Sequence, residues 1–175
     1  PGQAIDQLKR IANRLAKGET RDLPPIEVLP GSAMPGAAGA YASSDNTIYL
    51  HANWLESASN DQVIAVLNEE FGHHLDAQLN NSDTAGDEGE LFAILLSKET
   101  LESLNSDQLK AIRTEQDQGF IETPGGRKSV EFAVITGTNT AETLTGTADA
   151  DTITGGNEGI CFTSGAEPEL SHAFI

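Results

Sequence analysis

The sequence has few basic residues, few aromatic residues and a single cysteine. Ten lysines and arginines stand against 27 aspartates and glutamates, giving a formal net charge of −17 over 175 residues. Such a surface repels phosphate groups, so we expect neither a nucleic-acid partner nor binding to anionic membranes. The one cysteine, Cys161, excludes an intrachain disulfide framework. The apolar runs are too short to cross a bilayer, so no membrane insertion is expected.

What is present suits a globular chain. Hydrophobic residues make up 38% of the sequence, and 175 residues are enough for one domain with a small appendage. Periodicity and turn signals predict four helices and five short strands. The helices are expected over 4–17, 60–79, from about 87 onward, and over 106–117; the strands over 26–29, 41–43, 47–50, 120–123 and 127–134. This order predicts an α+β domain over residues 1–135.

The helix expected over 60–79 has the clearest boundaries. Ser59 precedes it and Gln62 follows three residues later, which is the spacing of a capping box. At about 100° per residue, five apolar residues form one stripe that we expect to face the core. They are Ile64, Leu67, Phe71, Leu75 and Leu79. Glu69, His73 and Asp76 then fall together on the opposite face.

That helix carries the segment Glu69-Glu70-Phe71-Gly72-His73-His74. Glu69 and His73 are one helical turn apart, so both can reach one metal ion. Glu70 lies about 100° round the helix, where it can hold a water molecule. His74 diverges from His73 by the same angle, which favours a packing or supporting role. On spacing alone, an ordinary charged helix with a carboxylate–histidine pair explains the segment equally well.

The segment resembles the H-E-x-x-H helix of zinc proteases, with Glu69 in place of the first histidine. The order of two strands, this helix, an acidic loop and a second helix resembles the gluzincin branch of the zincin metallopeptidases. This resemblance implies a zincin-like fold with a small sheet, Glu70 as general base, and Glu69 and His73 as metal ligands.

The resemblance also implies a third ligand from a glutamate on the following helix. Glu88 and Glu90 are both candidates. Glu88 fits a G-D-E-G pattern found in bacterial proteins that combine an E-E-x-G-H helix with C-terminal calcium repeats. The alternative is that both acids simply favour a helix N-terminus, where the helix dipole stabilises negative charge.

A carboxylate in place of an imidazole changes the expected metal chemistry. Two anionic ligands reduce the net positive charge of the ion, and oxygen ligands favour Mn²⁺, Fe²⁺ or Ca²⁺ relative to Zn²⁺. The resemblance implies Zn²⁺, and with these ligands we expect Zn²⁺ or another divalent transition metal. His51 could replace the missing imidazole, and Tyr41 or Tyr49 could lie near the oxyanion of a substrate; packing in the core is the alternative for all three.

From Thr136 the composition changes to a nine-residue repeat, residues 137–145 and 146–154. The repeat resembles the calcium-binding nonapeptides of RTX proteins, which leave the cell by type I secretion. The resemblance implies Ca²⁺ binding by Glu142 and Asp151 in a short β-roll-like or disordered tail over 136–159, and a secreted, extracellular location. A flexible tail rich in threonine and glycine is the alternative.

Residues 160–175 form a last segment. Cys161-Phe162-Thr163 resembles the start of Hint (intein-like) domains, but the match ends after Gly165, and an exposed thiol in a tail is the alternative. Taken together, we expect a secreted metal-dependent peptidase with an atypical, glutamate-containing site acting on a peptide or protein substrate. The alternative is a non-catalytic zincin-like module for calcium-dependent binding or adhesion. The oligomeric state is not indicated.

Overall fold

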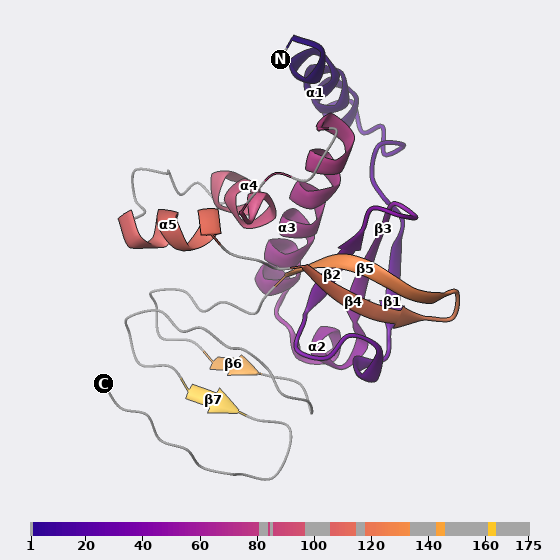
Figure 1. The fold of residues 1–175 in the computed structure, drawn as a ribbon, viewed down its shortest axis with the longest axis vertical. Helices are drawn as coiled ribbons and strands as arrows, with labels where there is room; N and C mark the ends of the chain where they lie inside the picture. Colours follow the sequence, from indigo (N-terminus) through magenta and orange to yellow (C-terminus); the bar gives the residue numbers. More distant parts are fainter. Residues whose placement is uncertain are drawn as a thin grey trace.

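The computed structural model of the chain describes residues 2–80, 84, 86–96, 106–114, 118–133, 143–145 and 161–163. It confirms the predicted α+β class (Figure 1). The helical elements are α1 (Gly2–Leu15), the 3-10 turn η1 (Gly31–Ala33), α2 (Ala52–Ser57), α3 (Asn60–Leu79), α4 (Glu88–Leu96) and α5 (Ser106–Thr114). The strands are β1 (Ile26–Leu29), β2 (Gly39–Ala42), β3 (Thr47–His51), β4 (Gln118–Thr123), β5 (Gly126–Ala133), β6 (Thr143–Thr145) and β7 (Cys161–Thr163).

Five strands form one mixed sheet in the order β1-β3-β2-β5-β4. β1 runs parallel to β3, whereas the other neighbours are antiparallel. The hairpin β4–β5 follows α5 in the chain but joins the sheet beside β2, where Glu131 is opposite Tyr41. The sheet therefore brings a late segment next to strands formed early in the chain. The strands β6 and β7 form a separate parallel pair.

The two faces of the sheet bury different groups of side chains, because successive residues of a strand point to opposite faces. On the face toward α3, the core contains Ala38, Tyr41, Ile48, Leu50, Trp54, Val66 and Ala133. On the other face it contains Leu29, Met34, Ala37, Ala40, Ala42, Tyr49, Ile121 and Val130. Both tyrosines are thus core residues, as their packing alternative predicted.

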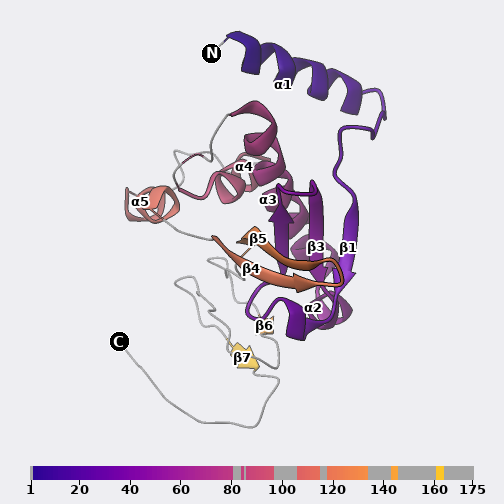
Figure 2. The ribbon, with the colours of Figure 1, turned by 45° about the vertical axis from the view of Figure 1, so that its right-hand side comes forward.

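The central helix α3 lies between the sheet on one side and α4 and α5 on the other (Figures 1 and 2). Its predicted start and end are confirmed, and Ser59 and Gln62 form the predicted capping box. Glycines permit the close packing on both sides. A Cβ at Gly39 of β2 would lie 2.6 Å from Cγ1 of Val66, and one at Gly72 would lie 2.7 Å from the Cα of Gly89 in α4.

The predicted core stripe of α3 is wrong. Ile64 is 55% exposed, and among the five predicted residues Leu75 alone is buried. The helix instead buries a largely polar set: Val66, Glu70, Gly72, His73, His74, Leu75 and Asp76. The reason is that α3 is covered from two sides, so the face that packs is set by the glycine contacts with β2 and α4 and not by the apolar stripe.

The other helices follow the sequence with one exception. α2 was not predicted; it begins after His51, whose Nδ1 accepts the backbone N–H of Trp54 at 3.1 Å. None of the helices that the structure describes combines the length and the apolar character needed to span a membrane.

Candidate metal centre

The centre of the candidate site is His73, whose side chain is 1% exposed. α3 supplies this residue, and the first turn of α4 packs directly against its ring. A Cβ at Gly89 would lie 2.4 Å from Nε2 and 2.7 Å from Cδ2 of His73. A side chain at position 89 would therefore displace the ring, so the glycine is required for α4 to reach the site.

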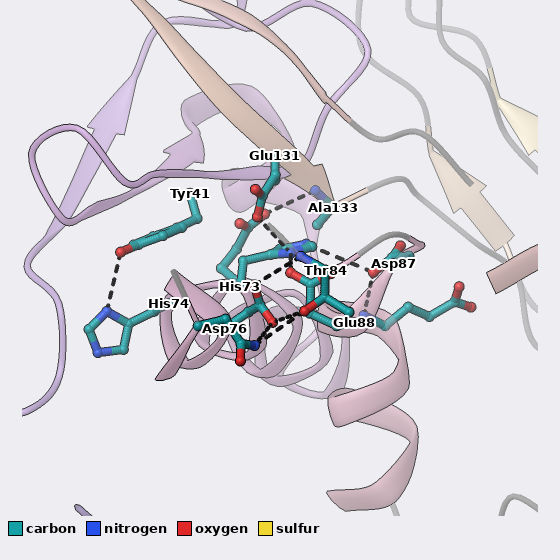
Figure 3. Close-up of polar contacts among 12 residues, drawn as sticks. Tyr41, His73, His74, Asp76, Thr84, Asp87, Glu88, Glu131 and Ala133 are labelled. Atoms are coloured by element: carbon teal, nitrogen blue, oxygen red, sulfur yellow. Dashed lines mark hydrogen bonds and ion pairs between the residues drawn. The ribbon is translucent and has the colours of Figure 1, made fainter. Parts of the chain in front are cut away.

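Carboxylates from three elements surround the imidazole (Figure 3). On the Nδ1 side, Glu88 Oε1 lies at 3.0 Å and Glu131 Oε2 at 2.9 Å. On the Nε2 side, Asp87 Oδ1 lies at 3.8 Å. Among the described residues, two groups have ligand atoms close enough to hold an ion: Glu69, His73 and Asp87, and His73, Glu88 and Glu131.

The sequence predicted Glu69, His73 and a glutamate of the next helix as ligands of one ion, whereas the structure places Glu69 in one group and Glu88 in the other, with His73 in both. The sequence left Glu88 and Glu90 open as the third acid, and the structure brings Glu88 to Nδ1 of His73. Glu90 belongs to neither group, although its charge acts on Glu69. Its backbone N–H donates to Asp87 Oδ1 at 2.6 Å, which makes Asp87 the cap of α4.

Sequence reasoning missed two acids of the cluster. Asp87 lies directly before Glu88. An aspartate at the start of a helix is explained by capping alone, so nothing in the sequence indicated a second role. Glu131 lies in a strand where Val130 and Phe132 pack on one face of the sheet and Ala133 on the other. Alternation therefore places Glu131 with Ala133 on the face toward α3. A glutamate at a strand position that faces the core could have indicated, from the sequence alone, that Glu131 belongs to the site.

The pKa values in the cluster respond to this crowding. Burial, and then the negative charges of Asp87 and Glu70, raise the pKa of Glu69 well above its ordinary value. Burial also raises the pKa of Asp87. Burial alone would lower the pKa of His73, but hydrogen bonds to Glu131 and Glu88 and the charge of Glu70 raise it to about 12. The surrounding acids thus favour the charged form of the imidazole in the metal-free protein.

Glu70, the predicted general base, points toward the sheet. Its side chain is fully buried, and Oε1 accepts the backbone N–H of Ala133 at 2.9 Å. This bond holds the end of β5 against α3. Glu70 lies near enough for its charge to act on His73, but it belongs to neither of the two metal-binding groups found among the described residues.

The remaining sequence candidates lie elsewhere. His51 caps α2 and belongs to neither group. The Tyr41 hydroxyl donates to Asn46 Oδ1 at 3.0 Å, and the Tyr49 hydroxyl donates to Asp45 Oδ2 at 2.8 Å. These bonds direct both hydroxyls away from His73. The predicted calcium ligands Glu142 and Asp151 lie outside the described residues.

His74 has surroundings of a different kind. Nδ1 is 2.7 Å from Asn46 Oδ1, and Nε2 is 3.0 Å from the carbonyl oxygen of Asp22. The ring also stacks on Phe71. Burial lowers the pKa of His74, although the carbonyl of Asp22 opposes this effect. The predicted packing role fits these contacts.

Comparison of the chain with protein-family models, with curated proteins and with solved structures found no match.

Proposed function

We propose that this domain binds one divalent metal ion at His73, in a site built on the zincin-like helix α3. The observation that carries the proposal is a buried imidazole on which five acids act: Glu69, Glu70, Asp87, Glu88 and Glu131. Carboxylates held out of water cost free energy unless a cation or a proton neutralises them. One imidazolium offsets a single negative charge, whereas a divalent ion offsets two.

The chemistry of the donors favours a transition metal. An imidazole nitrogen with carboxylate oxygens suits Zn²⁺, Mn²⁺ or Fe²⁺. Calcium takes about six to eight oxygen ligands, and an imidazole that fills one place reduces the affinity for it. The first preference of this site is therefore a divalent transition metal, as the sequence led us to expect.

Competitive metal loading tests this proposal. The protein is dialysed against equal concentrations of Ca²⁺, Mn²⁺, Fe²⁺ and Zn²⁺ under anaerobic conditions, and its metal content is then measured. We expect about one transition-metal ion per wild-type chain and none in His73→Gln. Glu122→Gln is the control, since Glu122 lies on β4 with a side chain that is 69% exposed. Wild-type protein that retains no ion would contradict the proposal.

Peptide hydrolysis is the second candidate function, and the observation that favours it is the electrostatic effect of Glu70 on His73. A bound ion of this kind supplies Lewis acidity toward a peptide carbonyl and acidifies water. Glu70 follows Glu69 in α3 and acts electrostatically on His73. The bond from Ala133 fixes one carboxylate oxygen of Glu70, so the other is the one that would take a proton.

The variant Glu70→Gln separates structure from catalysis. A glutamine oxygen still accepts the Ala133 N–H, but it cannot act as a base. We expect unchanged metal content and a loss of hydrolysis of an unfolded protein substrate by about 100-fold or more. A wild-type protein that holds metal without any hydrolysis that this variant removes would restrict the function to metal binding. The secreted location and a calcium-dependent binding role rest on the nonapeptide pattern alone.

A further inference from the structure

Acids lie on the side of each ring nitrogen of His73, and the two nitrogens of one imidazole cannot both have the same role. A neutral imidazole has one nitrogen that can bind a metal and one N–H that donates. The structure therefore poses a choice between Nδ1, near Glu88 and Glu131, and Nε2, on the side of Asp87. In a metal-bound histidine, the nitrogen that does not bind the metal carries the N–H, and the acceptor of that N–H fixes which nitrogen binds the metal.

Resting on the proposed metal function, we propose that the ion binds at Nδ1 of His73 with Glu88 and Glu131, while the Nε2–H faces Asp87. Glu131 of β5 then takes the place of Glu69, the ligand of α3 that the sequence led us to expect. The site joins the central helix, the first turn of α4 and a strand that follows both in the chain.

The distances support the Nδ1 face. Two carboxylate oxygens lie at 2.9 and 3.0 Å from Nδ1, and they come from different elements of the fold. A single N–H has one hydrogen and satisfies one acceptor well. Two anions that converge on one nitrogen are better satisfied by an ion lying between all three atoms. At Nε2 the corresponding distance to Asp87 is 3.8 Å.

The exposure of the surrounding acids to solvent also favours Nδ1. The side chains of Glu88 and Glu131 are 17% and 20% exposed, whereas that of Asp87 is 4% exposed. An ion at Nδ1 can therefore enter from solvent and complete its coordination with water or a substrate group. On the other face, the Nε2–Cδ2 edge of His73 is covered by the backbone at Gly89.

Asp87 has a second task that suits it to a supporting role. Its Oδ1 accepts the N–H of Glu90, and its backbone N–H donates to the carbonyl of Ile112 at 2.7 Å. The first bond fixes the carboxylate of Asp87 at the start of α4, and the second fixes its backbone against α5. At 3.8 Å from Nε2 this carboxylate is too far for a hydrogen bond, but its negative charge favours the N–H on the Nε2 side of the ring.

The tautomer of His73 in Zn²⁺-loaded protein tests the inference. Two-bond ¹H–¹⁵N correlations of ¹⁵N-labelled protein distinguish Nε2–H from Nδ1–H, and His73→Gln assigns the signals. We expect the Nε2–H tautomer, with Nδ1 shifted by the metal. The Nδ1–H tautomer in zinc-loaded protein would overturn the inference and leave the metal function intact. Failure to take up zinc at all would instead overturn the metal function and this inference with it.

Zinc affinities of paired variants give a second, independent test. Glu131→Gln removes a ligand, and we expect affinity to fall by more than about 100-fold. Asp87→Asn keeps an oxygen for the Glu90 N–H and removes only a supporting charge, so we expect a loss of about tenfold. Glu122→Gln on the neighbouring strand should bind as wild type does. A larger loss in Asp87→Asn than in Glu131→Gln would place the ion at Nε2 and overturn the inference.

Discussion

His73 and His74 are neighbours in one helix, yet they lie in opposite chemical surroundings. His73 turns toward acids from α3, α4 and β5. His74 turns toward the amide of Asn46 and a backbone carbonyl, and toward the hydroxyl of Tyr41 (Figure 3). The pKa of His73 is raised and that of His74 is lowered. Elements remote in sequence, and not the residue type, therefore decide which histidine is suited to bind a cation.

Replacing each histidine by glutamine should give the largest difference in the free energy of unfolding. In metal-free protein, His73→Gln leaves buried carboxylates without their cation, and we expect a loss of about 3–5 kcal/mol in the free energy of unfolding. His74→Gln loses hydrogen bonds of neutral groups, so we expect a loss of about 1 kcal/mol. Urea unfolding in the presence of a chelator measures both. Equal losses would show that the acids do not distinguish the two positions.

Gly89→Ala tests how α4 is brought to His73. The new Cβ would overlap both the ring and the carbonyl oxygen of Glu69 at 2.7 Å. Such overpacking costs about 1–3 kcal/mol, and it should also separate Glu88 from His73. Gly125→Ala is the control, because the atom nearest to its Cβ would be Oγ1 of Thr123 at 3.6 Å, an ordinary van der Waals contact. Thermal unfolding compares the two, and equal stability would refute the close contact of α4 with the ring.

The dependence of stability on pH should have opposite signs for the two histidines. The raised pKa of His73, about 12, means that its contribution is complete below an unfolded pKa of about 6.5 and is lost as pH rises toward 12. The lowered pKa of His74 means that stability falls as pH decreases below about 6.5, because the unfolded state takes up the proton first.

Stability curves of the two variants measure these signs. In chelator, the advantage of wild type over His73→Gln should shrink between pH 6 and pH 9. Its advantage over His74→Gln should shrink as pH falls from 7 to 5. Parallel trends in the two comparisons would show that the two rings do not differ in charge.

Glu69→Gln should have the smallest effect. Because burial and the charges of Asp87 and Glu70 raise the pKa of Glu69 well above its ordinary value, these surroundings disfavour a charge at position 69 and tolerate a neutral amide. We expect the free energy of unfolding in metal-free protein to change by less than about 1 kcal/mol. A much larger loss by urea unfolding would mean that Glu69 is folded as a charged partner of His73.

Local signals predicted the elements well, because capping residues and turn residues act within a few positions. Ser59 and Gln62 fixed the start of α3, and the pairing of Glu69 with His73 followed from helical spacing. Glu131 could not be paired with His73 from the sequence, because that contact requires the hairpin β4–β5 to join the sheet beside β2. The buried face of α3 was likewise set by glycines in β2 and α4.

Calorimetric titration of Zn²⁺ into chelator-treated wild type, His73→Gln and His74→Gln tests the central claim most directly. If His73 is the ligand and His74 a packing residue, wild type and His74→Gln should each bind about one ion, and His73→Gln should bind none at the same concentrations. Binding that survives in His73→Gln but is lost in His74→Gln would contradict the account.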